Sequence, residues 1–319
     1  MGLRLSVQQS AWYRNIAVVA SAMPGIIPVV KGNGYGFGRR NLMTIAAGLA
    51  DRIAVGTVYE VGDVPADRTA LVLTPHLDPL PPELPSSAVL TVGSLTHVAA
   101  LKSHGWTGAV AVKLQSSMRR YGVRPDELEN VLAGVSAAGL TVDSLALHLP
   151  LAGTPRDRLA EIDEWMPALD PLLSLAVSHV DAATWAELRR RHPGKLLRVR
   201  IGTALWHGDK SPLQLTADVL DVHSVTTGEV VGYRGAIVPT AGHVVVVGAG
   251  SAHGISVLDN GWSPFHFRHR RLTLLERPHM HSSMVVVPAE DPCPRVGERV
   301  DVQNPLIKTT VDELRWIRD

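Results

Sequence analysis

Short apolar runs alternate with longer amphipathic stretches from about residue 12 to residue 222. Each run is bounded by Gly, Pro or polar residues, and several precede a helical repeat, as in PRDRLAEIDEWMPAL. The runs are IIPVV, RIAVGTV, ALVLTP, AVLTV, AVAVKL, SLALHL, LSLAVS and LLRVRIG. Repeated strand-then-helix units predict a parallel sheet covered by helices. Eight strands at this spacing predict a TIM (β/α)8 barrel, with an open doubly wound sheet as the alternative.

The pattern changes after residue 222. Val-rich segments then alternate with turns, as in HVVVVGAGSAHG, HSSMVVVPAEDP and PRVGERVDVQNP, and no helical repeat appears before the last residues. Such alternation is typical of an antiparallel sheet. We therefore predict an α/β barrel over residues 1–222, followed by a smaller antiparallel all-β domain over residues 223–319. The first few residues could join the β domain.

Composition narrows the class of partner. The 31 Lys and Arg residues nearly balance the 30 Asp and Glu residues, so the charge indicates neither a nucleic acid nor an anionic membrane. A small molecule is the expected partner. Cys293 is the single cysteine, which excludes an intrachain disulfide and a cysteine-based zinc site and fits a reducing cytoplasm. The early run IAVVASAMPGIIPVV is broken by prolines and resembles neither a signal peptide nor a membrane span.

Lys31 is the first candidate for chemistry. It directly follows IIPVV, which places it at the carboxyl end of the first predicted barrel strand, where barrel enzymes assemble their active sites. An amine that is partly desolvated there has a lowered pKa and a free lone pair for Schiff-base chemistry. The alternative is a surface lysine that opens a flexible loop. Glycines 32, 34, 36 and 38 do not give the dinucleotide spacing, because Phe37 occupies the third glycine position, and GAGSAHG fails by one residue.

The last predicted barrel strand supplies a second group of candidates. In LLRVRIGTALWHGD the strand runs through Gly202 into Thr203, and phosphates commonly bind backbone N–H groups after strands seven and eight of such barrels. Arg200 projects from the same strand end, and an arginine that faces a pyridine nitrogen is one way to tune pyridoxal phosphate. The alternative for Arg200 is an ion pair with an acidic side chain on the barrel rim.

Taken in order, five segments resemble the alanine racemase family. They correspond to its lysine signature, its lysine and arginine segment, the strand that ends in a histidine, its phosphate motif and the start of its β domain. In this chain they read VVKGNGYGFG, VKLQSSMRRYGV, SLALHLPLAG, RIGTALWHG and EVVGYRG. The resemblance spans nearly the whole chain and implies the same succession of a barrel and a β domain.

The resemblance also implies a cofactor, an assembly and residue roles. The cofactor would be pyridoxal phosphate, held as an internal aldimine on Lys31, in a cytoplasmic homodimer whose active sites lie at the interface. The reaction would be proton exchange at the Cα of a small amino acid. Tyr35, Gly202 and Thr203 would bind the phosphate, Arg120 the phenolic oxygen, His148 the ring face and Arg200 the pyridine nitrogen, with Lys113 supporting Arg120.

The chain departs from the family in the β domain. Two-base racemisation needs one base on each face of the planar intermediate, and the family's second base is a partner-subunit tyrosine in a G-Y-x-D-G motif. Here AGSAHG puts Ser251 at the tyrosine and His253 at the aspartate. The family's M-D-Q reads MHS, with His281 replacing the acid, and its later Y-E pair reads Asp312 and Glu313. An acid beside a phosphate would repel it, so either that alignment or that contact is wrong.

These residues are consistent with three functions. The first is a racemase in which His253 or His281 is the second base, because histidine titrates near neutral pH, whereas a serine hydroxyl needs a base beside it. The second is a related pyridoxal-phosphate enzyme that uses one base, such as a decarboxylase or an isomerase of another amino acid. The third is a protein that binds the cofactor with little turnover. The histidines of FHFRHRR and RPHMHSS lack metal-site spacing, and we predict no metal site.

Overall fold

The computed structural model describes residues 2–318, and the chain divides into two compact units. The barrel unit contains residues 15–32 and 39–208, and the β unit contains the residues up to Arg14, residues 33–38 and the residues from Asp209 onward. The sequence analysis placed the boundary at residue 222. That position lies inside the long strand β10 (Leu213–Val225), which pairs with β1, β13 and β18 of the β unit along its length.

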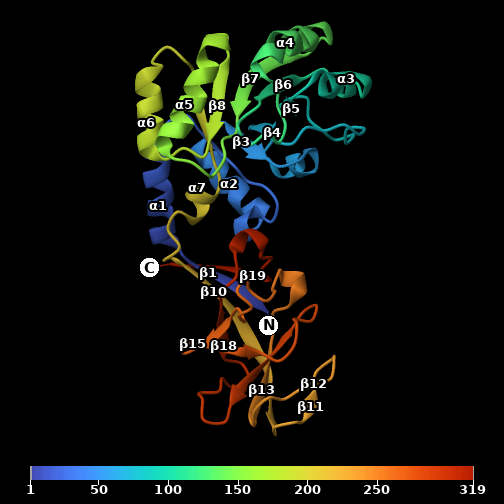
Figure 1. Cartoon of the computed structure of the whole chain (residues 1–319), viewed down its shortest axis with the longest axis vertical. Helices are drawn as coiled ribbons and strands as arrows, with labels where there is room; N and C mark the ends of the chain where they lie inside the picture. Colours follow the sequence, from blue (N-terminus) through green and yellow to red (C-terminus); the bar gives the residue numbers. More distant parts are fainter. Residues whose placement is uncertain (1, 319) are drawn as a thin grey trace. The chain divides into compact units, whose positions relative to one another are not determined.

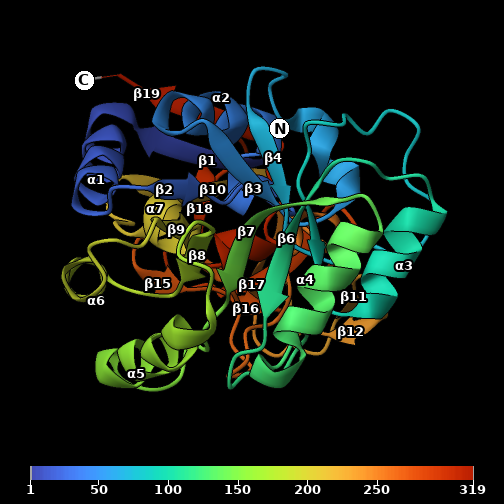
Figure 2. The ribbon, with the colours of Figure 1, turned by 90° about the horizontal axis from the view of Figure 1, so that it is seen from above.

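Eight parallel strands form the barrel unit, in agreement with the eight apolar runs (Figure 2). Six of them make one sheet in the order β2-β9-β8-β7-β6-β5, and β3 pairs with β4. Two parallel bridges, Val29 to Ala54 and Leu71 to Val89, join these sheets and close the ring. The strands are β2 (Ile26–Pro28), β3 (Arg52–Val55), β4 (Thr69–Val72), β5 (Leu90–Val92), β6 (Ala109–Leu114), β7 (Thr141–Leu147), β8 (Ser174–Ser178) and β9 (Leu197–Ile201). Closure confirms the TIM barrel and excludes the open doubly wound sheet.

The barrel interior is a packed core of small and branched apolar side chains. Ile27, Val29, Ala54, Leu71 and Val89 are at most 7% exposed and belong to one cluster, in or next to strands β2 to β5. The barrel strands are apolar on both faces because the core lies on the inner side and helices or loops cover the outer side. This explains the continuous apolar runs in the sequence. The core fixes where each strand ends, and therefore where the residues that follow the strands lie.

Helices surround the strands on the outside of the barrel unit (Figures 1 and 2). They are α1 (Gln9–Ala22, divided between the units at Arg14), α2 (Arg39–Leu49), α3 (Leu95–Ser103), α4 (Leu128–Ala137), α5 (Pro155–Trp165), α6 (Ala182–Arg191) and α7 (Thr203–His207). Short 3-10 turns are η1 (Gly34–Gly36), η2 (Val58–Asp63), η3 (Pro125–Glu127) and η4 (Met166–Ala168). Sequence signals set several helix starts, such as Thr154, which accepts the N–H of Asp157 at the start of α5. Within residues 2–318, no helix is both long enough and apolar enough to cross a membrane.

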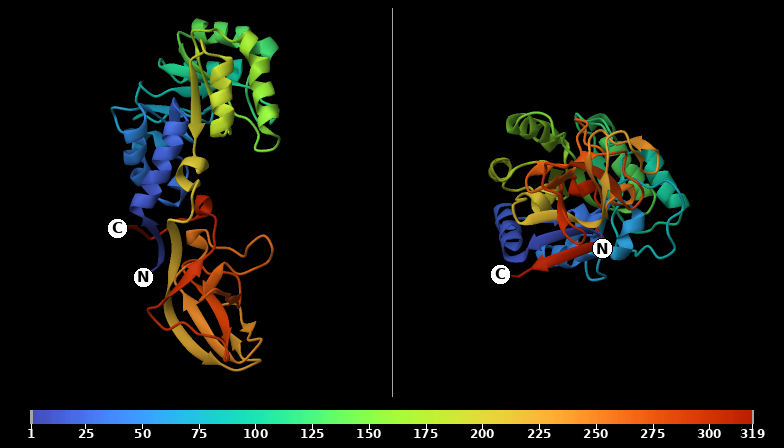
Figure 3. Two further views of the ribbon diagram at one scale, coloured as in Figure 1. Left: turned by 90° about the vertical axis from the view of Figure 1, so that its left-hand side faces the viewer. Right: turned by 90° about the horizontal axis from the view of Figure 1, so that it is seen from below.

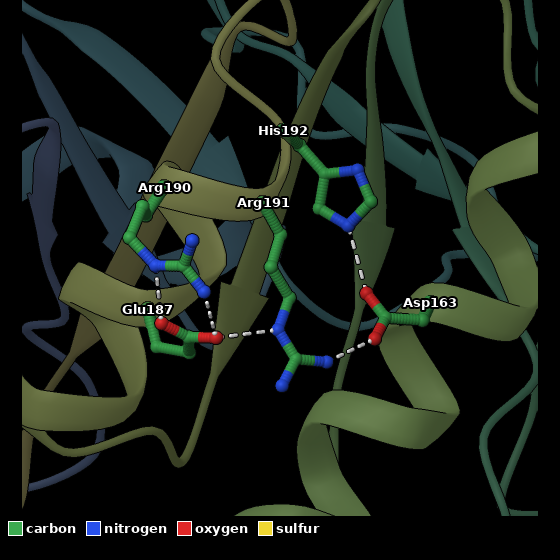
Figure 4. Close-up of polar contacts among 5 residues, drawn as sticks. All are labelled: Asp163, Glu187, Arg190, Arg191 and His192. Atoms are coloured by element: carbon green, nitrogen blue, oxygen red, sulfur yellow. Dashed lines mark hydrogen bonds and ion pairs between the residues drawn. The ribbon is translucent and has the colours of Figure 1, made fainter.

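An ion-pair network on the surface joins α5 to α6 (Figure 4). Arg191 donates to Asp163 of α5 at 2.6 Å and to Glu187, one turn earlier on α6, at 2.8 Å. Arg190 also donates to Glu187, and His192, which ends α6, contacts the other oxygen of Asp163 at 2.7 Å. The two arginines are exposed and the other three side chains are partly exposed, so the network orders two surface helices and adds little to the stability of the barrel.

The β unit is built around β10 (Figures 1 and 3). Its main path runs β15-β14-β18-β10-β13-β17-β16, and β1 pairs antiparallel with β10 and parallel with β19. The other strands are β1 (Leu3–Gln8), β11 (Val230–Val231), β12 (Ala236–Ile237), β13 (Gly242–Val247), β14 (Phe265–Phe267), β15 (Arg270–Arg271), β16 (Thr273–Leu274), β17 (Ser283–Pro288), β18 (Arg299–Val302) and β19 (Glu313–Ile317), with turns η5 (Ser251–His253) and η6 (Leu306–Lys308). The last residues are a strand rather than a helix, because they complete the sheet beside β1.

Candidate active site

Lys31 lies just after β2, in the loop that leads to η1. Gly32, Gly34, Gly36 and Gly38 all have positive φ angles, between 60° and 89°. Residues with a Cβ rarely adopt this conformation, so the alternating glycines let the chain turn sharply after the strand instead of extending. The glycines therefore have a backbone role in this turn.

Burial and charges of both signs act on the Lys31 amine within the barrel unit. Partial desolvation lowers the pKa of Lys31 most. The charge of Arg120 lowers it further, the charge of Glu60 raises it, and the charge of Arg200 lowers it. A lowered pKa increases the fraction of lysine present as the free amine at neutral pH, which is the nucleophilic form. Lys31 is exposed in the loop after β2, and its lowered pKa is a property that a reactive lysine needs.

Two buried cations lie at the strand ends without full hydrogen bonding. Lys113 on β6 is 4% exposed and Arg200 on β9 is 6% exposed. One Arg200 Nη donates to the carbonyl oxygen of Leu147 at 2.7 Å, whereas Arg200 Nε and Lys113 Nζ have no hydrogen-bond partner among residues 2–318. Burial, followed by the charges of Arg200 and Arg120, holds the pKa of Lys113 well below its ordinary value. Burial also lowers the pKa of Arg200, to about 10, so Arg200 stays charged at neutral pH. A buried nitrogen without a hydrogen-bond partner is costly, so both side chains favour a bound group that offers an acceptor or negative charge.

His148 follows β7 and belongs to the same group. Desolvation first, and then the charges of Arg200 and Lys113, lower the pKa of His148 to about 2, so its imidazole is neutral at neutral pH. Its Nδ1 lies 2.6 Å from the Ser178 hydroxyl at the end of β8, and its ring centroid lies 4.5 Å from that of His179. The ring is therefore held in place by its neighbours and can pack against another flat group.

Arg120, Gly202 and Thr203 complete the barrel part of the predicted site. Arg120 is exposed in the loop after β6, and its guanidinium carbon lies 5.0 Å from the Tyr121 ring centroid. Gly202 precedes the short helix α7, which begins at Thr203, and its carbonyl oxygen accepts the N–H of Leu205. The barrel unit thus brings Lys31, Lys113, Arg120, His148 and Arg200 into electrostatic contact at the carboxyl ends of its strands.

Tyr35 belongs to the other unit. It is 7% exposed in η1, with a φ of 55°, in the segment 33–38 that packs with the β unit. The side chain of Asn33 in the same segment donates to the carbonyl oxygens of Leu306 and Thr309. Tyr35 is four residues from Lys31 in the chain, and the proposed phosphate contact of Tyr35 stays a prediction.

The β unit brings together the segments that differ from the family pattern. The N–H of Ser251 donates to the carbonyl oxygen of His279 at 2.7 Å, and the N–H of Ala252 donates to that of Met280 at 2.9 Å. The rings of His253 and His281 lie 5.9 Å apart. AGSAHG and MHS are therefore neighbours in space, although about 30 residues separate them in the chain.

His253 is fixed by two hydrogen bonds and is 6% exposed. Its Nδ1 accepts the N–H of Gly250 at 3.0 Å, and its Nε2 lies 3.0 Å from Asp312 Oδ2. Because a backbone N–H can only donate, Nδ1 is the acceptor and Nε2 carries the hydrogen that bonds to Asp312. Both ring nitrogens are thus occupied. His281, in contrast, is exposed in the neighbouring loop.

Asp312 has a structural role in the β unit that the sequence analysis did not find. Its Oδ2 also accepts the N–H of Leu3 at 2.7 Å, and its own N–H donates to the carbonyl oxygen of Leu3. The adjacent Glu313 pairs with Arg4 at 2.5 Å. The two acids therefore fasten β19 to β1, which accounts for their presence without a phosphate contact. Among residues 2–318, no group of three or more His, Cys, Asp or Glu side chains could hold a metal ion.

The structure adds two residues to the barrel site that the sequence analysis missed. Ser178 contacts His148, and Glu60 accepts the N–H groups of Gly32 and Gly56 beside Lys31. Ser178 ends the predicted strand LSLAVS, so its position at a strand end was a usable signal. Glu60 lies in a 3-10 turn with no helical repeat, and no sequence signal marked it.

Comparisons with known proteins agree with this fold. The sequence family described as "Alanine racemase, N-terminal domain" matches residues 7–210, more than half of the chain. The solved alanine racemase of Bartonella henselae, which has covalently bound pyridoxal phosphate, superposes with a TM-score of 0.74 at 15% identity and covers 100% of both chains. The biosynthetic alanine racemase of Pseudomonas aeruginosa gives 0.74 at 22% identity, covering 100% of this chain and 99% of its own. The Corynebacterium glutamicum enzyme gives 0.74 at 20%, covering 99% and 100%. No curated protein matches the sequence.

The closed barrel, the order of the motifs and the family match lead to one assignment: the chain belongs to the alanine racemase family. Its fold is that of the family, a TIM barrel and an antiparallel β unit.

Proposed function

We propose that this chain is a pyridoxal-phosphate-dependent amino-acid racemase in which Lys31 holds the cofactor. The observation that carries the proposal is the buried pair of Lys113 and Arg200, each with a nitrogen that lacks a hydrogen-bond partner in the described chain, next to a lysine with a lowered pKa. An anionic cofactor with a ring nitrogen provides an acceptor for Arg200, and its negative charge offsets the positive charge around Lys113 and Arg200. The residues present fit the group.

The family resemblance supplies the roles of the individual residues. Arg200 would donate to the ring nitrogen, Arg120 would contact the phenolic oxygen, and Lys113 would support Arg120. The neutral ring of His148, ordered by Ser178, would pack on the cofactor. The phosphate would bind the N–H groups of Gly202 and Thr203 and the hydroxyl of Tyr35, because N–H groups at the start of a helix have no partner within it.

When bound, pyridoxal phosphate withdraws electrons from the substrate and acidifies the proton at its Cα. Lys31 would take or return that proton on one face of the substrate, and its lowered pKa favours the free amine that this role needs. Arg200 stays protonated, so it would keep the ring nitrogen unprotonated and restrain side reactions of the carbanion. Proton return to Cα is then the favoured outcome.

The second base is best assigned to His281 of the partner subunit in a homodimer. His253 would have to give up the N–H of Gly250 or the carboxylate of Asp312 before it could accept a proton, whereas His281 is exposed beside it. The engagement of His253 also favours a second candidate, a one-base pyridoxal-phosphate enzyme, in which the proton returns only from the side of Lys31. The proposal of a small amino acid as the substrate rests on the family resemblance.

The cofactor assignment is tested by visible absorption. The purified chain is titrated with pyridoxal phosphate beside Lys31→Ala, with Lys102→Ala, an exposed lysine of α3, as the matched control. We expect a band that borohydride bleaches in the parent and in Lys102→Ala and that is missing in Lys31→Ala. No band in the parent chain under any loading would refute the proposal.

The second-base assignment is tested by proton exchange. The loaded enzyme is incubated with D-alanine and L-alanine in D2O, and the configuration and Cα deuterium are measured by chiral separation and NMR. The two-base assignment is supported if the parent chain racemises alanine and His281→Gln does not, while His281→Gln still exchanges the Cα proton of one enantiomer. Exchange without inversion in the parent chain supports the one-base enzyme instead.

A further inference from the structure

Glu60 holds the chain immediately after Lys31 to the end of the neighbouring strand. One carboxylate oxygen accepts the N–H of Gly32 at 2.9 Å, and the other accepts the N–H of Gly56, which follows β3, at 2.6 Å. A Cβ on Gly56 would lie 3.4 Å from the Cβ of Lys31 and 3.0 Å from Glu60 Oε2. The lysine stem, the strand end and the carboxylate therefore pack against one another.

The peptide after Lys31 is also held from its carbonyl side. Arg39 Nη1 donates to the carbonyl oxygen of Gly32 at 2.8 Å, and Arg39 Nε donates to Asp63 Oδ2 at 2.6 Å. Glu60 and Asp63 both belong to η2. The 3-10 turn η2 thus holds Gly32 on both sides: Glu60 binds its N–H, and Asp63 binds Arg39, which binds its C=O. Gly32 itself has a φ of 60°. Charge-assisted hydrogen bonds of this kind are stronger and shorter than neutral ones.

The charges around the Lys31 amine give the carboxylate a second effect. Desolvation lowers the pKa of Lys31 most, the charges of Arg120 and Arg200 lower it further, and the charge of Glu60 raises it. Glu60 therefore opposes the cations of the site at the amine.

We propose that Glu60 is a positioning residue for Lys31: its carboxylate fixes the backbone that carries the lysine and supplies negative charge beside the amine. The inference rests on the proposed function for the reaction that Lys31 performs. Glu60 lies on η2, and neither the sequence motifs nor the family resemblance assigned it a role. Glu60 acts through Lys31 and its backbone, so its effect is measurable on the lysine itself.

The first test measures the pKa of the Lys31 amine in chain freed of cofactor with hydroxylamine. Competitive acetylation over a pH series, followed by peptide mass spectrometry, reports that pKa without any turnover. The variant is Glu60→Gln, which is isosteric and uncharged, and the matched control is Glu83→Gln, an exposed carboxylate elsewhere in the barrel unit. Removing the carboxylate charge lowers the pKa of Lys31, because Glu60 is the group that raises it in the parent chain, and Glu83→Gln leaves that pKa unchanged.

A folded Glu60→Gln whose Lys31 titrates as in the parent chain would overturn the inference, even if its melting temperature falls, because a purely structural role changes stability alone. A lowered pKa of Lys31 in a chain that forms no absorption band with pyridoxal phosphate keeps the assignment of Glu60 and refutes the proposed function. The two proposals therefore fail separately.

If Glu60→Gln does not fold, Glu60→Asp provides the second test. Aspartate keeps the charge but is one methylene shorter, so it cannot reach both N–H groups. The absorption band with pyridoxal phosphate then develops more slowly, by about threefold or more, because Lys31 is less well placed. A band that develops at the parent rate in Glu60→Asp would overturn the positioning role.

Discussion

The partly buried imidazole of His148 makes the unfolding free energy of the barrel unit fall in acid. Desolvation, followed by the charges of Arg200, Lys113, His179 and Arg120, lowers its pKa to about 2 in the folded chain, against an ordinary value of 6.5. Below pH 6.5 the unfolded chain therefore binds a proton at this position that the folded chain does not. Stability falls as the pH falls wherever the unfolded state binds more protons, so the loss begins near pH 6.5 and continues toward pH 2.

The magnitude follows from the same two pKa values. Between pH 7 and pH 5 the folded histidine stays neutral while the unfolded histidine becomes almost fully charged, which corresponds to about 2 kcal/mol of lost unfolding free energy. Glutamine has no titration in this range and retains a polar group for the Ser178 hydroxyl. Replacing His148 by glutamine should therefore remove this part of the acid sensitivity.

The assay is urea unfolding at pH 7 and at pH 5, on chain treated with hydroxylamine to remove cofactor. Three proteins are compared: the parent, His148→Gln and His269→Gln, an exposed histidine that controls for the loss of a histidine as such. His148→Gln should lose about 2 kcal/mol less than the parent between the two pH values. Equal losses in His148→Gln and the parent would refute the electrostatic account of this site.

Two further substitutions test the backbone and the β unit. Gly122→Ala should destabilise the barrel unit by about 2 kcal/mol or more, because the residue has φ of 137° and a Cβ would lie 2.6 Å from the carbonyl carbon of Leu114. An unchanged unfolding midpoint would contradict the steric reasoning. His253→Asn should cost about 1 to 3 kcal/mol in urea unfolding, because the shorter side chain cannot bond both Gly250 and Asp312. Stability equal to that of the parent would show that the two bonds are dispensable.

Much of the fold could be predicted from local patterns. The eight apolar runs coincide with the eight barrel strands, because a buried parallel strand must be apolar on both faces. Helix caps such as Thr154 also follow directly from residue type. The β unit was predicted as a class, although its strand order and the pairing of β19 with β1 were not.

The candidate site was predictable only in part. Lys31 and Arg200 could be found because each stands at the end of an apolar run, and parallel strands place their ends at one edge of the barrel. Glu60 could not be found, because its importance comes from the N–H groups of Gly32 and Gly56, which are 28 and 4 residues away in the chain. The pairing of His253 with Asp312, 59 positions later in the numbering, was equally hidden.

The sequence by itself determined the elements, their parallel or antiparallel class and the residues at strand ends, since these depend on periodicity and on neighbouring residue types. The tertiary structure decided which charges meet and which remain without partners. Lys113 is an ordinary lysine within AVAVKL; burial and the approach of Arg200 from β9 hold its pKa well below its ordinary value. Desolvation and long-range charge depend on all the surrounding atoms, and these come together only when the barrel closes.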